Sequence, residues 1–401
     1  MVIKNIYPLT GVFIFIFGLS PLSYTIGLNF SILSIIVMIL VASRINIILK
    51  NKYIILLIPL SLILSFASFI YWGGSSIKIF LLPYFYLVSI LYVLGSRNED
   101  IRIFTKVSTK ILILFIIGGW IGFTYKLIGG QSLFSLPLKG GEYNLDLFLT
   151  TFTKIGGISE IAGVIRPTAI YDEPGTFAFI ICCVALLRHK LKLKKRNTWI
   201  LLLGGLISFS LALFIYIFFH IGSYIKWNRK IIRNFLFTII LISGTVSILP
   251  NLGFFDTLIL SRFEINESTG QFVGDNRSSA IELAASYINP EMLLWGIDKL
   301  CMLDVYAASL KYGRYGDNPL YPLVSFGLLI SWIYYFTIIL LIVIGIRRKS
   351  NFVYLGLLIL FFQRPYFSNF IYSFFIFYSI RVNFMYRYAN KSEKNDKLKL
   401  N

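Results

Sequence analysis

Charged side chains are scarce in this chain of 401 residues: 14% are Asp, Glu, Lys or Arg, whereas 57% are hydrophobic. Soluble domains carry about 25% charged residues, so the composition excludes an ordinary soluble fold. Several apolar runs approach or exceed the roughly 20 residues that an α-helix needs to cross a bilayer. The sequence predicts an all-α polytopic membrane protein with one integral domain over residues 1–390.

Cysteine and histidine are also rare. Cys182 and Cys183 are adjacent and Cys301 is alone, a spacing that excludes a disulfide framework and gives no metal pattern. His189 and His220 are far apart in the sequence, and a lone histidine near a helix end is typically a surface or interface residue. No Asp-x-Asp pair, Walker motif or dinucleotide-binding glycine motif is present, so we expect neither a metal nor a cofactor.

Two further absences concern the membrane segments. No charged residue interrupts the middle of an apolar run as a proton relay would, and Arg381 comes nearest, toward an inner end. This argues against a pump or an ion-coupled carrier. The first apolar run, residues 12–19, has no small-residue cleavage site, so we interpret it as a retained first helix.

What the chain does contain is a series of twelve candidate spans. They cover about 8–22, 28–43, 53–71, 79–95, 108–127, 174–188, 197–209, 211–226, 231–250, 319–346, 351–363 and 367–387. Basic loops mark the cytoplasmic side, and the strongest is 188–196. The stretch 197–226 satisfies this rule only as two short helices turning near Ser208-Phe209-Ser210. Both termini are then cytoplasmic, and the Lys/Asn-rich tail 391–401 is predicted to be disordered.

The net charge of +20 follows from this topology. It orients the chain and attracts anionic membrane lipid, so nucleic acid is not an expected partner. Two long periplasmic loops remain, about 128–173 and 251–318, and the semi-apolar residues 142–155 are expected to lie on the membrane surface.

The first of these loops ends in a charged stretch, Arg166 to Phe179. Asp172 and Glu173 directly precede Pro174, which suits the first position of a helix. Negative charge is favoured there by the helix dipole. This stretch is a candidate site for charged chemistry at the mouth of a membrane helix.

Five arginines are retained on the predicted outer side, where basic residues are normally depleted. They are Arg166, Arg262, Arg277, Arg314 and Arg364. The guanidinium fork matches phosphate oxygens, so together they suggest an outside ligand that carries phosphate. The alternative is that each arginine pairs with a neighbouring carboxylate and ties loops together.

Arg277 opens a predicted helix whose apolar face is Ile281, Ala284, Ala285 and Ile288 and which Pro290 ends. A cation in a first helical turn opposes the dipole unless it holds an anion. Asp317-Asn318-Pro319 repeats the pattern of Glu173-Pro174 after Arg314, with a simple helix cap as the alternative.

The motifs in this order resemble the O-antigen polymerase and ligase superfamily of bacterial membrane glycosyltransferases. They are Arg166, Asp172-Glu173-Pro174-Gly175, Phe177-Ala178, Ser208 with Ser210, Arg277, Trp295-Gly296, Asp317-Asn318-Pro319 and Phe326-Gly327-Leu328. The resemblance covers about residues 160–335, and it departs from the ligase pattern. A ligase uses an outer-loop histidine beside an asparagine, where this chain has Asp317 beside Asn318.

The resemblance implies a glycosyltransferase C-like membrane fold in the bacterial inner membrane. It implies an undecaprenyl-diphosphate-linked oligosaccharide as substrate at the periplasmic face, with a chain-length regulator protein as a further partner. An O-antigen polymerase is favoured, with an O-antigen ligase as the alternative and a lipid-linked oligosaccharide flippase as the alternative of another class. Glu173 or Asp317, with Asp172 as a further candidate, would accept the acceptor's proton, and the five arginines would neutralise the diphosphate.

Overall fold

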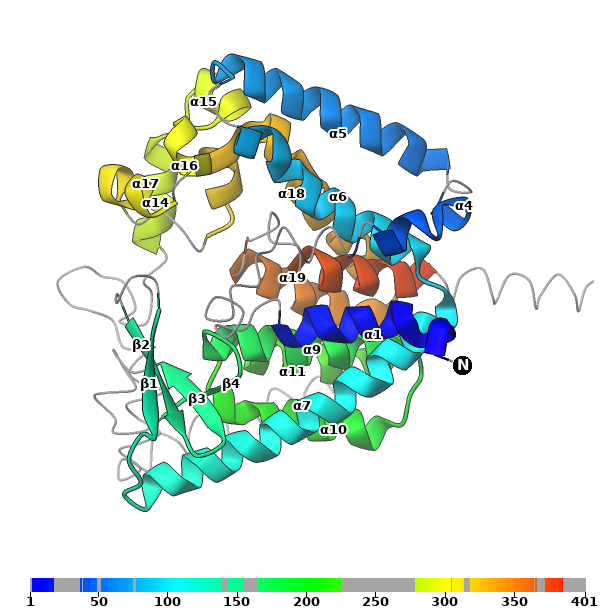
Figure 1. The fold of residues 1–401 in the computed structure, drawn as a ribbon, viewed down its shortest axis with the longest axis vertical. Coiled ribbons are helices and arrows are strands. Elements are labelled where there is room, and N and C mark those ends of the chain that lie inside the picture. Colours follow the sequence, from blue (N-terminus) through cyan, green and yellow to red (C-terminus); the bar gives the residue numbers. More distant parts are fainter. Residues whose placement is uncertain are drawn as a thin grey trace, which may run out of the picture.

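The chain is mostly helical in the computed structural model, as expected from its composition (Figure 1). The structure describes residues 2–17, 37, 39–48, 52–74, 77–138, 143–154, 165–224, 278–303, 305–313, 318–363, 365 and 372–384. Two helices are long and apolar enough to cross a membrane, α7 (Asn98–Leu127) and α18 (Tyr321–Arg347). Several shorter apolar helices accompany them.

The other described helices overlap the predicted spans in part, and the short helices at 45–48 and within 278–312 lie outside any predicted span. The other described helices are α1 (Val2–Phe17), α4 (Ile45–Ile48), α5 (Lys52–Tyr71), α6 (Ile77–Gly95), α9 (Pro174–Lys190), α10 (Lys195–Gly204), η2 (Gly205–Ser208), α11 (Leu211–Tyr224), α14 (Ser278–Ser286), α15 (Pro290–Trp295), α16 (Lys299–Leu303), α17 (Val305–Tyr312), η4 (Lys349–Asn351) and α19 (Val353–Gln363). Residues 372–384 are also helical. The predicted span 231–250 and the tail 391–401 lie outside the described residues.

Helix α7 begins ten residues before the predicted span at 108. Polar residues stabilise this earlier start. Asp100 accepts a 2.7 Å hydrogen bond from the backbone N–H of Arg97, and Glu99 and Asp100 occupy the first turn. Negative charge at a helix start is stabilising, so the helix extends beyond its apolar part.

The expectation of an all-helical chain is wrong within the first outer segment. Four antiparallel strands form one sheet in the order β1-β2-β3-β4: β1 (Phe134–Leu138), β2 (Tyr143–Phe148), β3 (Thr151–Lys154) and β4 (Pro167–Ala169). Leu145 and Phe152 bury their side chains together, so the described residues 143–154 of the semi-apolar stretch contribute to a sheet. Strands this short carry a weak period-two pattern, which general apolarity masks.

The sheet packs on the C-terminal half of α7 (Figure 1). The side-chain oxygen of Thr150 donates to the carbonyl of Gly118 at 2.6 Å. A Cβ on Gly122 would lie 2.5 Å from the carbonyl oxygen of Phe148, so the missing side chain permits this approach. In Figure 1 the sheet and helices α14–α17 lie at the same end of the long helices.

Helix α9 forms the centre of the molecule. Every residue from Thr176 to Arg188 is buried, on all faces of the helix. It packs against α7, α10, α11 and α19. A helix that is apolar all round is stable only when it is enclosed, so α9 fixes the positions of whatever lies at its two ends.

The ambiguous stretch after α9 is a hairpin, as the charge pattern predicts. Helix α10 continues into η2, the chain turns at Phe209 in a left-handed conformation (φ 47°), and α11 returns. Trp199 of α10 and Tyr224 of α11 have ring centroids 6.5 Å apart, which closes the open end of the hairpin.

Polar contacts join loops that the charge pattern assigns to one side. Arg44 pairs with Asp100 at 2.5 Å, and Lys190 donates to the carbonyl of Ser350 at 2.7 Å. Arg381 donates to the carbonyls of Val93 and Leu94, in the last turn of α6, and of Ser96, which directly follows α6. A cation is favourable at a helix C-terminus, which accounts for Arg381 as a structural cap.

Candidate functional site

Pro174 opens α9 as predicted, at the first helical position. Glu173 precedes it in an extended conformation (φ −144°), and its side chain makes no capping hydrogen bond. Asp172 accepts a 3.0 Å hydrogen bond from the hydroxyl of Thr176, whose oxygen is 3.1 Å from the hydroxyl of Tyr372. Asp172 therefore braces the helix start against residues 372–384.

Glu173 extends toward the sheet. Its carboxylate lies 3.7 Å from the ammonium of Lys154, at the end of β3, and both side chains are about one-third exposed. An ion pair at this exposure contributes roughly 0–1 kcal/mol, so it orients Glu173 more than it stabilises the fold. The carboxylate remains partly accessible to solvent.

Arg166 connects the sheet to the tip of the helical hairpin. Its backbone N–H donates to the Thr153 hydroxyl at 3.2 Å, directly before Lys154. Its guanidinium donates to the carbonyls of Ser208 at 3.3 Å and Phe209 at 3.2 Å. The left-handed Phe209 turns these carbonyls toward the arginine. The hydroxyl of Ser208 is buried and has no hydrogen-bond partner among the described residues.

The structure thus gathers three predicted site residues, Arg166, Asp172 and Glu173, around β4 and the start of α9. The guanidinium of Arg166 already donates to two backbone carbonyls, so Arg166 has a structural contact besides any role in ligand binding. The other predicted residues, Arg262, Arg277, Arg314, Asp317 and Arg364, lie outside the described residues.

Residues close in sequence to Arg277, Asp317 and Arg364 line one cavity of about 270 Å³. Leu211 follows the hairpin tip that holds Arg166, and Ile281 lies one helical turn after Arg277 in sequence. Asn318 directly follows Asp317, and Gln363 directly precedes Arg364. The cavity is apolar apart from these two amides, so it suits an apolar chain with a polar head at its rim.

Asn318 connects two of these segments. Its side chain is fully buried, accepts from the N–H of Leu320 at 2.8 Å and donates to the carbonyl of Ala280 at 3.3 Å. Helix α18 begins only at Tyr321, after Leu320 and without a side-chain cap, so the interpretation of Asn318-Pro319 as a helix cap is wrong. Asn318 instead stabilises the turn before α18 and ties it to α14.

Helix α14 occurs where it was predicted, but its packing differs. Ala280 and Ala284 are the buried residues, whereas Ile281, Ala285 and Ile288 are exposed. The helix ends at Ser286 before Pro290, and Pro290 instead begins α15. Asn289 caps α15 by accepting from the N–H of Met292 at 2.9 Å, a start signal that the sequence interpretation missed.

Two glycine motifs are in direct contact. The N–H of Ile297 donates to the carbonyl of Val324 at 2.8 Å, which brings Trp295-Gly296 against Phe326-Gly327. A Cβ on Gly327 would lie 2.3 Å from the carbonyl oxygen of Leu294. Trp295 also stacks on Tyr71 with ring centroids 4.1 Å apart, so the end of α5 belongs to the same junction.

A carboxylate that the sequence analysis did not select braces this region. Asp298 accepts from the N–H of Leu300 at 2.9 Å, from Lys311 at 2.8 Å and from the hydroxyl of Tyr312 at 2.5 Å. Burial opposes its ionisation, yet these hydrogen bonds outweigh burial and lower the pKa of Asp298 below its ordinary value. Asp298 therefore holds α16 and α17 together as an anion.

The two histidines, distant in sequence, are neighbours in the structure. The ring centroids of His189 and His220 lie 5.2 Å apart, beside Trp199 and Tyr224. Only the hairpin makes this contact, so no sequence signal revealed it. Within the described part of the chain, no group of three His, Cys, Asp or Glu residues could hold a metal ion, and all three cysteines are free and buried.

No protein family, curated protein or solved structure matches this chain. The fold and the site define the class of this protein: it is apolar and mostly helical, with two candidate membrane spans. A charged site lies at one end of its buried central helix.

Proposed function

We propose that this chain is a membrane-embedded O-antigen polymerase with about twelve spans and a glycosyltransferase C-like arrangement. It transfers a growing glycan from undecaprenyl diphosphate to a new lipid-linked repeat unit at the periplasmic face of the inner membrane. The observation that carries this proposal is the convergence at one end of the helices. Arg166, Asp172 and Glu173 gather there, and the sequence neighbours of Arg277, Asp317 and Arg364 line one apolar cavity.

The chemistry follows from the donor. A hydroxyl oxygen of the acceptor sugar attacks the anomeric carbon of the donor glycan, and a glycosidic bond forms. The bond from that carbon to the diphosphate oxygen breaks, and undecaprenyl diphosphate leaves with the electron pair. The acceptor proton passes to a carboxylate, for which Glu173 and Asp317 are the candidates. The negative charge that builds on the leaving group is neutralised by cations, for which the five arginines are the candidates.

The described contacts support different roles for the candidate carboxylates. Asp172 is engaged by Thr176 at the helix start, so we assign it to positioning. Glu173 is partly exposed and paired with Lys154, so it is the better base of the two. Arg166 holds the hairpin tip, and it serves the diphosphate together with Arg262, Arg277, Arg314 and Arg364.

The decisive experiment is deletion of the gene in its host, followed by analysis of surface polysaccharide. A lost polymerase leaves the lipid core capped by a single repeat unit. Lipid core without any attached sugar would indicate a ligase instead, and repeat units held inside the membrane would indicate a flippase. Either of these two outcomes would overturn the proposal.

Complementation of that deletion tests the arginines. Arg277→Lys preserves charge and removes the planar fork, so it should lose most polymer while the protein remains in the membrane. Full polymer length with Arg277→Lys would exclude bidentate binding by this residue.

A further inference from the structure

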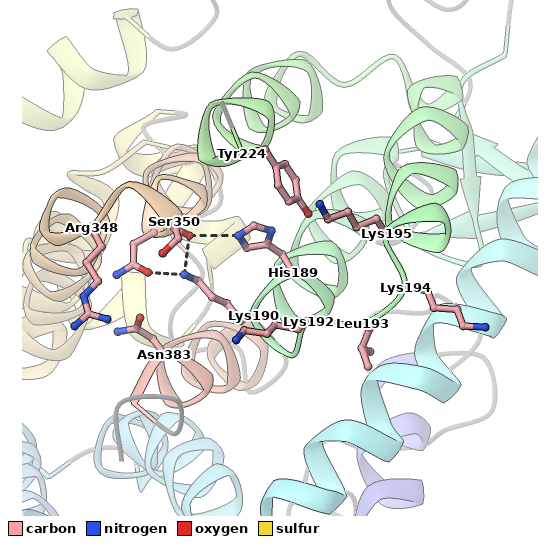
Figure 2. A pocket seen from close by; sticks show the side chains of 11 residues that line it. His189, Lys190, Lys192, Leu193, Lys194, Lys195, Tyr224, Arg348, Ser350 and Asn383 are labelled. Atoms are coloured by element: carbon pink, nitrogen blue, oxygen red, sulfur yellow. Dashed lines mark hydrogen bonds between the residues drawn. The ribbon is translucent and has the colours of Figure 1, made fainter. Parts of the chain in front are cut away.

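A second cavity lies at the opposite end of α9 from Arg166. It has a volume of about 740 Å³ and is bounded by the α9–α10 loop, the segment after α18 and the helical residues 372–384 (Figure 2). Helix α9 has 17 residues, so about 25 Å separates its two ends. The cavity is therefore distinct from the charged site at the start of α9.

Basic side chains from two segments line this cavity. Lys190, Lys192, Lys194 and Lys195 come from the end of α9 and the following loop, and Arg348 comes from the end of α18. No Asp or Glu is among the described residues that line it. Cytoplasmic loops are rich in lysine in any membrane protein. That rule does not explain why basic side chains from separate segments surround one cavity. Like charges at such a cavity repel one another unless an anion is bound between them.

The arrangement in Figure 2 shows which cations face the cavity. Arg348 and Asn383 lie on one side of Lys190, whereas Lys195 and Tyr224 lie on its other side. Lys194 extends away from this group. Lys190 is held by the carbonyl of Ser350 and by the side chain of Asn351.

Asn383 supplies a donor that lacks an acceptor. Its side chain is only 6% exposed, and its Nδ2 has no hydrogen-bond partner among the described residues. A buried donor without a partner is unfavourable, and such groups call for a missing ligand or water. An anionic oxygen in the cavity would accept from Asn383 and face the cations at the same time.

Lys192, a further cation that lines the cavity, lies in the turn that ends α9. It adopts a left-handed conformation (φ 50°) directly after the end of α9. Glycine is the residue that adopts this conformation without steric strain at a helix C-terminus. A lysine at this position retains a cation at a conformational cost.

We propose that this cavity is a binding site for a phosphate-bearing anion, held by Lys190, Lys192 and Arg348 with a hydrogen bond from Asn383. The phosphate belongs either to an anionic lipid headgroup or to a soluble phosphate compound, since both present the same oxygens. The site lies on the side that the charge pattern assigns to the cytoplasm.

The test is thermal unfolding of the full-length protein purified in a neutral detergent. One titration adds sodium pyrophosphate, with sodium chloride of equal ionic strength as the reference. A second compares nanodiscs of phosphatidylcholine with nanodiscs that contain phosphatidylglycerol. The matched variants are Arg348→Gln and Arg347→Gln, which remove one exposed charge each from adjacent positions, of which only Arg348 lines the cavity.

We expect the wild type and Arg347→Gln to be stabilised by the anion, and Arg348→Gln to need at least tenfold more of it for the same shift in Tm. Lys192→Gly removes a cation while relieving the left-handed strain, so it should weaken the response equally without lowering Tm in the absence of ligand. Stabilisation by pyrophosphate supports a soluble phosphate source, and stabilisation only by phosphatidylglycerol supports a headgroup.

Two results would overturn the assignment. The first is the absence of a response to either anion. The second is an equal loss of response in Arg347→Gln and Arg348→Gln, which would show that the basic residues act only as diffuse surface charge.

Discussion

Gly296 and Gly327 meet backbone to backbone where α15 crosses α18. A Cβ on Gly327 would lie 2.6 Å from the nitrogen of Gly296, and a Cβ on Gly296 would lie 3.0 Å from the nitrogen of Gly327. Both residues have positive φ, 88° and 65°. Gly327 also interrupts the helical dihedrals of α18, so this contact lies at the kink where α15 packs on α18.

Substitution of Gly327 by alanine should therefore be costly. The new Cβ would clash with three backbone atoms and would strain the left-handed conformation. We expect Gly327→Ala to lose roughly 2–4 kcal/mol of unfolding free energy, the sum of overpacking and left-handed strain. Thermal unfolding in detergent measures this loss. Gly129→Ala is the control, because Gly129 has φ 90° but no atoms within 4 Å of its Cβ position. Equal losses would show that packing at Gly327 is unimportant.

Variants of Glu173 and Lys154 test whether Glu173 is a catalytic base or only a partner in an ion pair. If Glu173 accepts the acceptor's proton, Glu173→Gln should abolish polymer formation in the complemented deletion strain, whereas Lys154→Gln should retain it. If the pair is only structural, both variants should behave alike, with a stability loss of about 1 kcal/mol or less. Membrane protein levels by immunoblot provide the control for folding.

Asp298 predicts a pH dependence of stability. Its pKa is lowered in the folded state, so it stabilises the fold above the unfolded value of about 4 and loses this contribution as the pH falls through the folded value. Asp298→Asn should have a lower Tm than the wild type at pH 7, and the difference should shrink below about pH 4. A difference that stays constant down to the acid limit would contradict the proposed role of the anion.

The sidedness of the chain can be tested by cysteine labelling. The three native cysteines are buried, so they should give little background with a membrane-impermeant maleimide. Ile128 is 79% exposed at the end of α7, and Arg196 is exposed at the start of α10. In intact spheroplasts Ile128→Cys should be labelled and Arg196→Cys should be labelled only after lysis. The reverse pattern would invert the orientation and move the site that contains Arg166 to the cytoplasm.

Local sequence signals located several elements correctly. Pro174 marks the start of α9, and the hairpin at Ser208-Phe209-Ser210 follows from the basic residues on either side of it. Signals that depend on periodicity failed where the chain is apolar throughout, as in the four-stranded sheet and in the buried face of α14.

The sequence by itself determined that the chain is an apolar helical protein with segregated charge, because hydropathy and the distribution of Lys and Arg are properties of composition and order. It also placed Arg166, Asp172 and Glu173 beside a helix start, because capping is local. Only the tertiary structure decided which distant residues meet. Arg166 reaches the hairpin tip, Gly296 faces Gly327, and Lys192 and Arg348 line one cavity, because these contacts arise from packing around the buried α9 rather than from any spacing along the chain.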